Sequence, residues 1–385
     1  SMLTDGTGDY IYERQWGSDV DENAKFQSPK GIAVDKEDAI YVTDQLSYPV
    51  QKFDKRLNFM ERWAGNSTDP GSFKLPEGIC FDASGNIYVA DTQNNRIQKF
   101  TPDMVFSLEW ESHQPDDIAI SNDGLLFSAN GSVINVYNPE TGVYQFTLPP
   151  PDGGLPSLHG IAFDTANNFY AVGASDKIYK YRPDGVNSWS YIATWTVPQS
   201  GVFLPNLTSM TTDPDNNIYV TDTRGYRVVK MDSTGSFVKD LGGPLYGTGD
   251  GMFMSDMKGI SYGPDGFIYV ADSRNNRIQK LTTDLVYVGQ FGEHGFAPGE
   301  FNNPRAVKGT PDGKYYVVDS YNNRIQMFEK KQLGTNSKAI IVAGGGNDNN
   351  SLWPSTKVVS DLAAWVLGYQ GFSPENIKYQ SAEYI

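Results

Sequence analysis

Aspartates, arginines and a few histidines are the residues of this chain whose types and spacing could do chemistry. In three nearly identical stretches, an aspartate stands five positions before an arginine. A carboxylate beside a guanidinium can move a proton, hold a charged ligand, or close a structural ion pair. Active sites are rarely repeated within one chain, so we interpret these residues as structural pairs across a turn. They are Asp91 with Arg96, Asp272 with Arg277, and Asp319 with Arg324.

The chain contains one cysteine, Cys80, which excludes an internal disulfide. It lies in the apolar stretch "GICFD", and we predict a small buried core residue rather than a nucleophile. Metal chemistry would depend on the three histidines, His113, His159 and His294. Their use depends on the elements that position them.

Those elements are repeated. "IYVADTQNNRIQKF" (Ile87–Phe100) returns as "IYVADSRNNRIQKL" (Ile268–Leu281), and strands of this type end every 39 to 50 residues, at positions 44, 91, 130, 173, 222, 272 and 319. A repeat of 40–50 residues is typical of propeller blades. In every repeat a second apolar run precedes this strand, and it begins twelve positions before the residue that ends the strand. Its first residues are Ile32, Ile79, Ile118, Ile161, Met210, Ile260 and Val307.

Each repeat has four strand-like segments joined by turns rich in Gly, Asn and Asp, which predicts a four-stranded blade. The seventh repeat lacks its fourth strand, whereas a spare strand, "YIYERQWG" (Tyr10–Gly17), precedes the first. We therefore predict an all-β, seven-bladed propeller over residues 10–329. The N-terminal strand closes the ring and leaves no open sheet edge between the chain ends.

The stretch "PEGICFDASGNIYVADTQNNRIQKF" (Pro76–Phe100) resembles the NHL repeat family. Repeats three and four depart from the pattern, because Asn130 and Gly173 replace the strand-ending aspartate and the Asn-Asn-Arg turn is missing. Six blades are common in that family, so seven is a departure. The resemblance implies that ligands bind at the mouth of the central channel, where loops enter the innermost strands.

We expect the mouth to be lined by the residue two places before each innermost-strand anchor. Cations from repeats six, seven and one should form a basic arc that faces acidic residues from repeats two and three. Such a mouth fits a protein, peptide or small ligand that carries opposite charges, although solvated rim charge is the alternative. The predicted mouth residues are Lys30, Glu77, Asp116, His159, Thr208, Lys258 and Arg305.

The function predicted from these residues is a non-catalytic binding or scaffold propeller. The alternative is a metal-assisted propeller enzyme with His159 and Glu77 in its site, because the chain is also similar to peptidyl-hydroxyglycine lyases, streptogramin lyases and gluconolactonases. Only His159 falls at a mouth position, so a site of three imidazoles for zinc is poorly supported. We expect no cofactor, with calcium on Glu77 and Asp116 as the chemically reasonable exception.

Composition limits the partners. The chain has 31 Lys and Arg against 46 Asp and Glu, a net charge of −15, which argues against binding to nucleic acid. No run of 18 apolar residues occurs, so no membrane span is expected. We expect a monomer. The acidity and the single cysteine fit a secreted or envelope setting in a prokaryote as well as the cytoplasm.

The pattern changes near residue 338, after a linker at 330–337. "KAIIVAGGG" predicts a buried parallel strand, "STKVVSDLAAWVLGYQG" a helix, and "SPENIKYQSAEYI" a second strand. One β-α-β unit cannot cover its own strands, so we interpret residues 338–385 as the start of a truncated α/β domain. This tail resembles the opening of caspase-like and legumain-like cysteine peptidases. The propeller would then be accessory to a peptidase, but no His or Cys follows residue 338 to do that chemistry.

Overall fold

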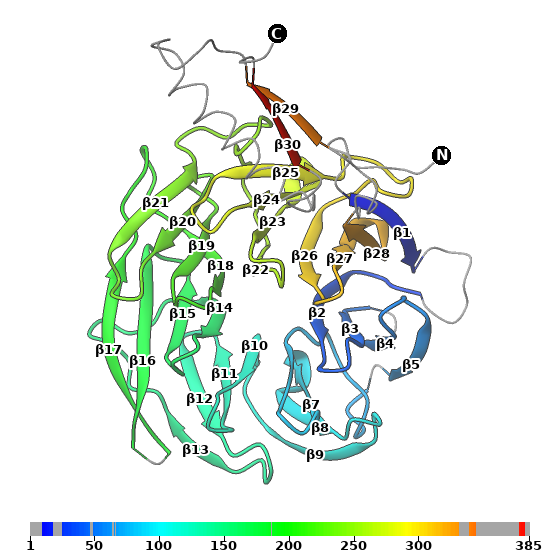
Figure 1. The fold of residues 1–385 in the computed structure, drawn as a ribbon. Coiled ribbons are helices and arrows are strands. Elements are labelled where there is room, and N and C mark those ends of the chain that lie inside the picture. Colours follow the sequence, from blue (N-terminus) through cyan, green and yellow to red (C-terminus); the bar gives the residue numbers. More distant parts are fainter. Residues whose placement is uncertain are drawn as a thin grey trace. The chain divides into compact units, whose positions relative to one another are not determined.

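Seven four-stranded antiparallel sheets surround a central axis in the computed structural model of this chain (Figure 1). The structure describes residues 10–17, 25–46, 49–63, 65, 67–185, 187–330, 339–343 and 377–381. Each sheet is one blade, and its strands run outward from the axis in chain order, with one exception in the last blade. The prediction of an all-β, seven-bladed propeller is confirmed.

The blades follow the sequence repeats. Blade 1 consists of β2 (Pro29–Val34), β3 (Ile40–Asp44), β4 (Val50–Phe53) and β5 (Phe59–Trp63), and blade 2 of β6 (Ile79–Phe81), β7 (Ile87–Asp91), β8 (Arg96–Phe100) and β9 (Phe106–Glu111). Blade 3 consists of β10 (Asp117–Ile120), β11 (Leu126–Asn130), β12 (Val133–Tyr137) and β13 (Tyr144–Thr147), and blade 4 of β14 (Leu158–Phe163), β15 (Phe169–Gly173), β16 (Lys177–Gly185) and β17 (Ser188–Thr196). Blade 5 consists of β18 (Leu207–Thr212), β19 (Ile218–Asp222), β20 (Arg227–Met231) and β21 (Phe237–Gly242), and blade 6 of β22 (Gly259–Tyr262), β23 (Ile268–Asp272), β24 (Arg277–Leu281) and β25 (Tyr287–Phe291).

Blade 7 joins the two ends of the propeller sequence. Its strands β26 (Pro304–Gly309), β27 (Lys314–Asp319) and β28 (Arg324–Lys330) are followed outward by β1 (Tyr10–Trp16). A hydrogen bond of 2.9 Å from Arg324 Nη1 to Gln15 Oε1 ties the two strands together. The predicted closure by the N-terminal strand is therefore confirmed.

The Asn-Asn turns do more than reverse the chain. In blades 2, 6 and 7 a single turn of 3₁₀ helix stands between the second and third strands, namely η1 (Thr92–Asn94), η2 (Ser273–Asn275) and η3 (Ser320–Asn322). The second asparagine follows in the left-handed region, with φ of 55° at Asn95 and at Asn276 and 52° at Asn323. Asparagine tolerates this conformation better than most residues, which explains why it stands at this position of the turn.

The core lies between the blades. The second strands are buried along their length, as in Ile87–Asp91, because a neighbouring blade covers each face of the sheet. The partly buried Lys314 at the start of β27 is the exception. The innermost strands approach so closely that small residues are required. A β-carbon on Gly259 would lie 2.6 Å from the carbonyl oxygen of Arg305, and one on Gly31 would lie 2.9 Å from that of Glu77. These contacts fix the mouth residues of one blade against the next.

Aspartate, tyrosine and lysine link the blades on the face opposite the mouth. Asp82 accepts hydrogen bonds from the backbone of its hairpin and one of 2.9 Å from the Tyr88 hydroxyl. The ammonium group of Lys99 lies 5.5 Å from the centre of the Tyr88 ring and pairs with Glu140 of the next blade at 2.9 Å. Blades 4 and 5 repeat the arrangement of aspartate, tyrosine and lysine. The repeated sequence thus encodes contacts between blades as well as within them.

The tail forms a separate unit. The first compact unit of the chain contains Tyr12–Glu329, and the second includes the chain from Lys330 onward. Its described strands, β29 (Ala339–Ala343) and β30 (Ile377–Ser381), pair in parallel, which confirms the two strands predicted there. The predicted helix between them lies outside the described residues, and the resemblance to a peptidase stays a prediction. Within the described part of the chain no helix is long and apolar enough to cross a membrane.

Candidate functional site at the channel mouth

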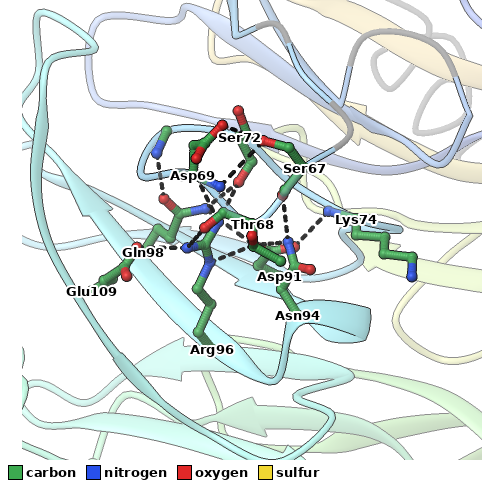
Figure 2. A network of polar contacts seen from close by, with 11 residues as sticks. Ser67, Thr68, Asp69, Ser72, Lys74, Asp91, Asn94, Arg96, Gln98 and Glu109 are labelled. Atoms are coloured by element: carbon green, nitrogen blue, oxygen red, sulfur yellow. Dashed lines mark hydrogen bonds and ion pairs between the residues drawn. The ribbon is translucent and has the colours of Figure 1, made fainter.

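The repeated aspartate and arginine hold the loops that lead to the mouth (Figure 2). Arg96 Nε donates to Asp91 Oδ2 at 2.7 Å, and the other guanidinium nitrogens donate to the carbonyl oxygens of Thr68, Asp69 and Ser72 at 2.7–2.9 Å. Asp91 in turn accepts a hydrogen bond of 2.7 Å from the backbone N–H of Lys74. This network fixes the loop three residues before the mouth residue Glu77.

The same network recurs in other blades. Arg277 pairs with Asp272 at 3.0 Å and Arg324 with Asp319 at 2.7 Å, and both arginines also donate to loop carbonyls. Burial raises the pKa of Asp272 and of Asp319, and the arginines oppose that rise. The prediction that these pairs are structural is confirmed, because each carboxylate is fully buried and its hydrogen bonds go to its own blade and loop.

The mouth residues form a charged series in the predicted order. Lys30 Nζ lies 3.9 Å from Glu77 Oε1. Burial lowers the pKa of Lys30, Glu77 opposes this change, and Arg305 and Lys258 add to it. The basic residues of blades 6, 7 and 1 are therefore close enough to repel one another.

The acidic side of the mouth is also continuous. Burial raises the pKa of Glu77, Lys30 and Arg305 oppose the rise, and Asp116 adds to it. Burial likewise raises the pKa of Asp116, which the neighbouring His159 opposes. The described contacts thus join a basic group and an acidic group in one continuous series of charges.

Not every predicted mouth residue is available to a ligand. Thr208 Oγ1 donates a hydrogen bond of 3.0 Å to the carbonyl oxygen of Met257, and it also lies 3.0 Å from Thr221 Oγ1. His159 Nδ1 lies 3.3 Å from the carbonyl oxygen of Leu207, although the ring is largely exposed. Thr208 is therefore mainly a link between blades 5 and 6.

Two polar residues at the mouth were missed by the sequence prediction. Asp256 forms an ion pair with Lys258 and neutralises it. Gln45 Nε2 donates 3.0 Å to Glu77 Oε1. A signal for Gln45 was present, because the equivalent position in four other blades is a hydroxyl residue. Those residues are Thr92, Thr223, Ser273 and Ser320.

Arg305 differs from the other two cations. Lys30 pairs with Glu77 and Lys258 with Asp256, whereas the Nε of Arg305 is buried and has no hydrogen-bond partner in the described part of the chain. A buried donor without a partner costs about 1–3 kcal/mol. Buried donors without a partner are uncommon in native proteins, so Arg305 is a candidate for binding an acceptor group.

The residues considered for metal or nucleophilic chemistry do not gather. Among the described residues, no group of three His, Cys, Asp or Glu side chains is placed to hold a metal ion. His113 is exposed on the chain before the mouth, and His294 lies near Phe296, with ring centres 6.4 Å apart. Cys80 is partly rather than fully buried, which corrects the prediction, because it lies on the innermost strand. Burial still raises the pKa of its thiol.

The fold and the repeats define the class of this protein, a seven-bladed β-propeller that carries NHL repeats. The NHL repeat family matches residues 73–100 and 258–281. Each match includes one of the Asp–Arg pairs, Asp91 with Arg96 or Asp272 with Arg277. No curated protein matches the chain at a significant level.

Solved structures share the architecture at low sequence identity. Virginiamycin B lyase from Staphylococcus aureus aligns with a TM-score of 0.65 and 11% identity, over 83% of this chain and 99% of that one. A streptogramin B lyase aligns with a TM-score of 0.65 and 14% identity, over 84% of this chain and 98% of that one. A catalytically inactive variant of the S. aureus lyase with quinupristin also gives 0.65, at 12% identity, over 83% and 99% of the two chains. Identities this low show a shared fold and not a shared activity.

Proposed function

We propose that the propeller is a recognition module that binds the carboxylate of a protein, peptide or small ligand at the channel mouth. The observation that carries the proposal is the buried Nε of Arg305, which has no partner among the described residues. A guanidinium binds a carboxylate through two parallel hydrogen bonds, which is stronger and more selective than a point charge.

The charges around Arg305 support an anion there. Lys30 interacts electrostatically with Arg305 and is compensated by Glu77, whereas Lys258 is compensated by Asp256. Arg305 is thus the mouth cation without a paired carboxylate in the described part of the chain. On a chain of net charge −15, an uncompensated cation at a ring of converging loops favours a specific anionic ligand.

In this proposal the propeller presents a partner or substrate to the domain that begins after Glu329. In a longer protein that supplies the catalytic His and Cys, the caspase-like resemblance of the tail would make that domain a peptidase with the propeller as its scaffold. The Asp–Arg networks support such a role, because they hold the mouth loops rigid and so lower the entropy that binding costs.

The test compares N-acetyl-diglycine, which has a free carboxylate, with N-acetyl-diglycinamide, which has none, by ligand-observed NMR. We expect the carboxylate form to bind and Arg305→Gln to weaken it about 10- to 100-fold, since a hydrogen bond to a charged group is worth about 1.5–3 kcal/mol. Arg274→Gln is the matched control, because Arg274 is exposed on a turn of blade 6. Equal binding of the two peptides, or equal effects of the two variants, would contradict the proposal.

A second candidate is a metal-assisted lyase or lactonase. It is favoured by the lyases among the similar structures. Asp116 interacts electrostatically with both Glu77 and His159, although these three residues are not placed to hold a metal ion among the described residues. Stoichiometric calcium or zinc in purified protein, with turnover that a chelator abolishes, would favour this function over recognition. Metal-free protein without turnover would favour recognition.

A further inference from the structure

Small residues flank the anchors of the innermost strands, with two charged exceptions. The position just before each innermost-strand anchor is Gly, Ser or Ala in six blades, and Asp117 in blade 3. The position just after each anchor is Ala, Cys, Thr or Ser in six blades, and Lys308 in blade 7. The small residues before the anchor are Gly31, Gly78, Gly160, Ser209, Gly259 and Ala306, and those after it are Ala33, Cys80, Ala119, Ala162, Thr211 and Ser261.

Small residues are needed at these positions because neighbouring innermost strands nearly touch. Ser261 Oγ donates a hydrogen bond of 2.9 Å to the carbonyl oxygen of Val307 in the next blade. Thr211 Oγ1 accepts one of 3.2 Å from the N–H of Tyr262. A charged side chain in such a place breaks the local rule of the repeat. Positions that break a local rule without a structural gain are where function is expected.

Lys308 is the first of the two charged exceptions. It lies on β26, the innermost strand of blade 7, and its side chain is nevertheless exposed. The surrounding ring still excludes bulk water, which lowers the pKa of the Lys308 amine, and Asp117 opposes that change.

Asp117 lies across the axis from Lys308. Its strand β10 and the lysine's strand β26 stand on opposite sides of the ring centre (Figure 1). The Asp117 Oδ1 accepts a hydrogen bond of 3.0 Å from the N–H of the next residue, Ile118. The Asp117 Oδ2 accepts one of 3.3 Å from the N–H of Ile161 in blade 4. The carboxylate is therefore held in place and keeps lone pairs that no described donor uses.

Lys308 and Asp117 repeat the arrangement of charges at the mouth, with the cation on blade 7 and the carboxylate on blade 3. Lys308 is three residues below Arg305 on the same strand, about 10 Å deeper at the rise of a β-strand. Asp117 directly follows the mouth residue Asp116. At both levels the cations belong to the side of blade 7 and the carboxylates to that of blade 3. No direct ion pair joins Lys308 to Asp117 among the described contacts.

We propose that Lys308 and Asp117 form an inner binding site in the channel for a small zwitterion, such as a free dipeptide or amino acid. Its carboxylate lies against the Lys308 amine and its ammonium group against the Asp117 carboxylate. Each end of the ligand then supplies the direct counter-charge that neither side chain has among the described contacts. A ligand with only one charge would leave one of them uncompensated.

The test uses diglycine, N-acetyl-diglycine and diglycinamide with the full chain, by ligand-observed NMR and calorimetry at pH 7.5. We expect diglycine to bind at least tenfold more tightly than either capped form. Lys308→Met and Asp117→Asn should each remove that advantage, and Lys308→Arg should keep part of it. Lys239→Met, an exposed lysine on the outer strand β21, is the matched control.

The outcomes separate this site from the mouth. Lys308→Met should leave the binding of N-acetyl-diglycine unchanged, because that peptide depends on Arg305. Melting curves of each variant show whether it folds, and Lys308→Arg provides a second variant if Lys308→Met does not. Equal affinities for diglycine and N-acetyl-diglycine, no binding of diglycine, or unchanged affinity in folded Lys308→Met would each overturn the inner site.

Discussion

Replacing Arg96 with methionine should be among the most destabilising single changes in the propeller. Arg96 neutralises Asp91, whose side chain is fully buried, and donates to three loop carbonyls (Figure 2). Methionine keeps the length of the side chain and removes all of these donors. Asp91 would keep the N–H of Lys74 and the amides of Asn94 and Gln98, but no charge partner.

The magnitude follows from what remains buried. Breaking a buried ion pair by removing one partner costs about 3–5 kcal/mol, because the other charge stays in the protein without compensation. We expect a value near the middle of that range, since three amide or N–H donors still stabilise the carboxylate. The double variant Asp91→Asn with Arg96→Met should lose less than the two single changes together, because it leaves no fully buried charge without a partner. Glu109, which also loses its ion pair with Arg96, is partly exposed.

The assay is urea unfolding followed by tryptophan fluorescence, with Lys177→Met as the control. Lys177 pairs with Asp176 at 3.2 Å, but both side chains are partly exposed, so about 1 kcal/mol or less is expected there. Hydrogen exchange of residues 67–74 should rise selectively in Arg96→Met. If Arg96→Met unfolds within about 1 kcal/mol of the parent, the network is not what holds the mouth loops, and this reasoning is refuted.

Two further predictions test the close packing around the axis and the buried charge there. Gly259→Ala should lower the free energy of unfolding by about 1–3 kcal/mol, because its β-carbon would lie 2.6 Å from the carbonyl oxygen of Arg305. Gly185→Ala is the control and should be nearly neutral, since the nearest atom to its β-carbon would be 3.5 Å away. Thermal unfolding of the two variants tests this difference. Burial raises the pKa of Asp117 to about 6, against the opposing effects of backbone hydrogen bonds and Lys308. The folded protein therefore binds a proton more readily than the unfolded chain, and stability should fall by up to about 3 kcal/mol as pH rises from about 4 to above 6. Asp117→Asn should flatten that part of the pH profile, and a slope that persists unchanged in Asp117→Asn would assign the effect to other groups.

Blade number and ring closure could be predicted from the sequence because both depend on a regular period. The missing fourth strand of the last repeat and the spare strand at Tyr10–Gly17 left one simple arrangement, which the structure has. The Asp–Arg pairs could also be predicted from the sequence, because the two residues are five positions apart and flank one turn.

The partners of those arginines could not be predicted in the same way. Thr68, Asp69 and Ser72 belong to a loop without periodicity, and they contribute backbone oxygens rather than side chains. Backbone contacts of this kind leave no mark on residue type. Asp256 was missed for a related reason, since its place beside Lys258 depends on its own backbone, which has φ of 77°.

The mouth shows both the strength and the limit of aligning repeats. Counting from the anchors placed Lys30, Glu77 and Asp116 in one charged series, as the electrostatic contacts require. Counting could not show that Thr208 is occupied by contacts between blades. Whether a side chain is free for a ligand depends on its neighbours in space, which the repeat alone does not specify.

The pairing of β1 with β28 constrains how the chain can be made. The hydrogen bond between Gln15 and Arg324 spans 309 positions. A ribosome that adds roughly 5–20 residues per second needs on the order of a quarter of a minute to a minute to cover that separation. Throughout that time the first strand is outside the ribosome without its partner, while earlier blades can already fold from local contacts. Ring closure must therefore come last, and the waiting strand and the uncovered flank of blade 1 are where a chaperone would be needed and where aggregation would begin.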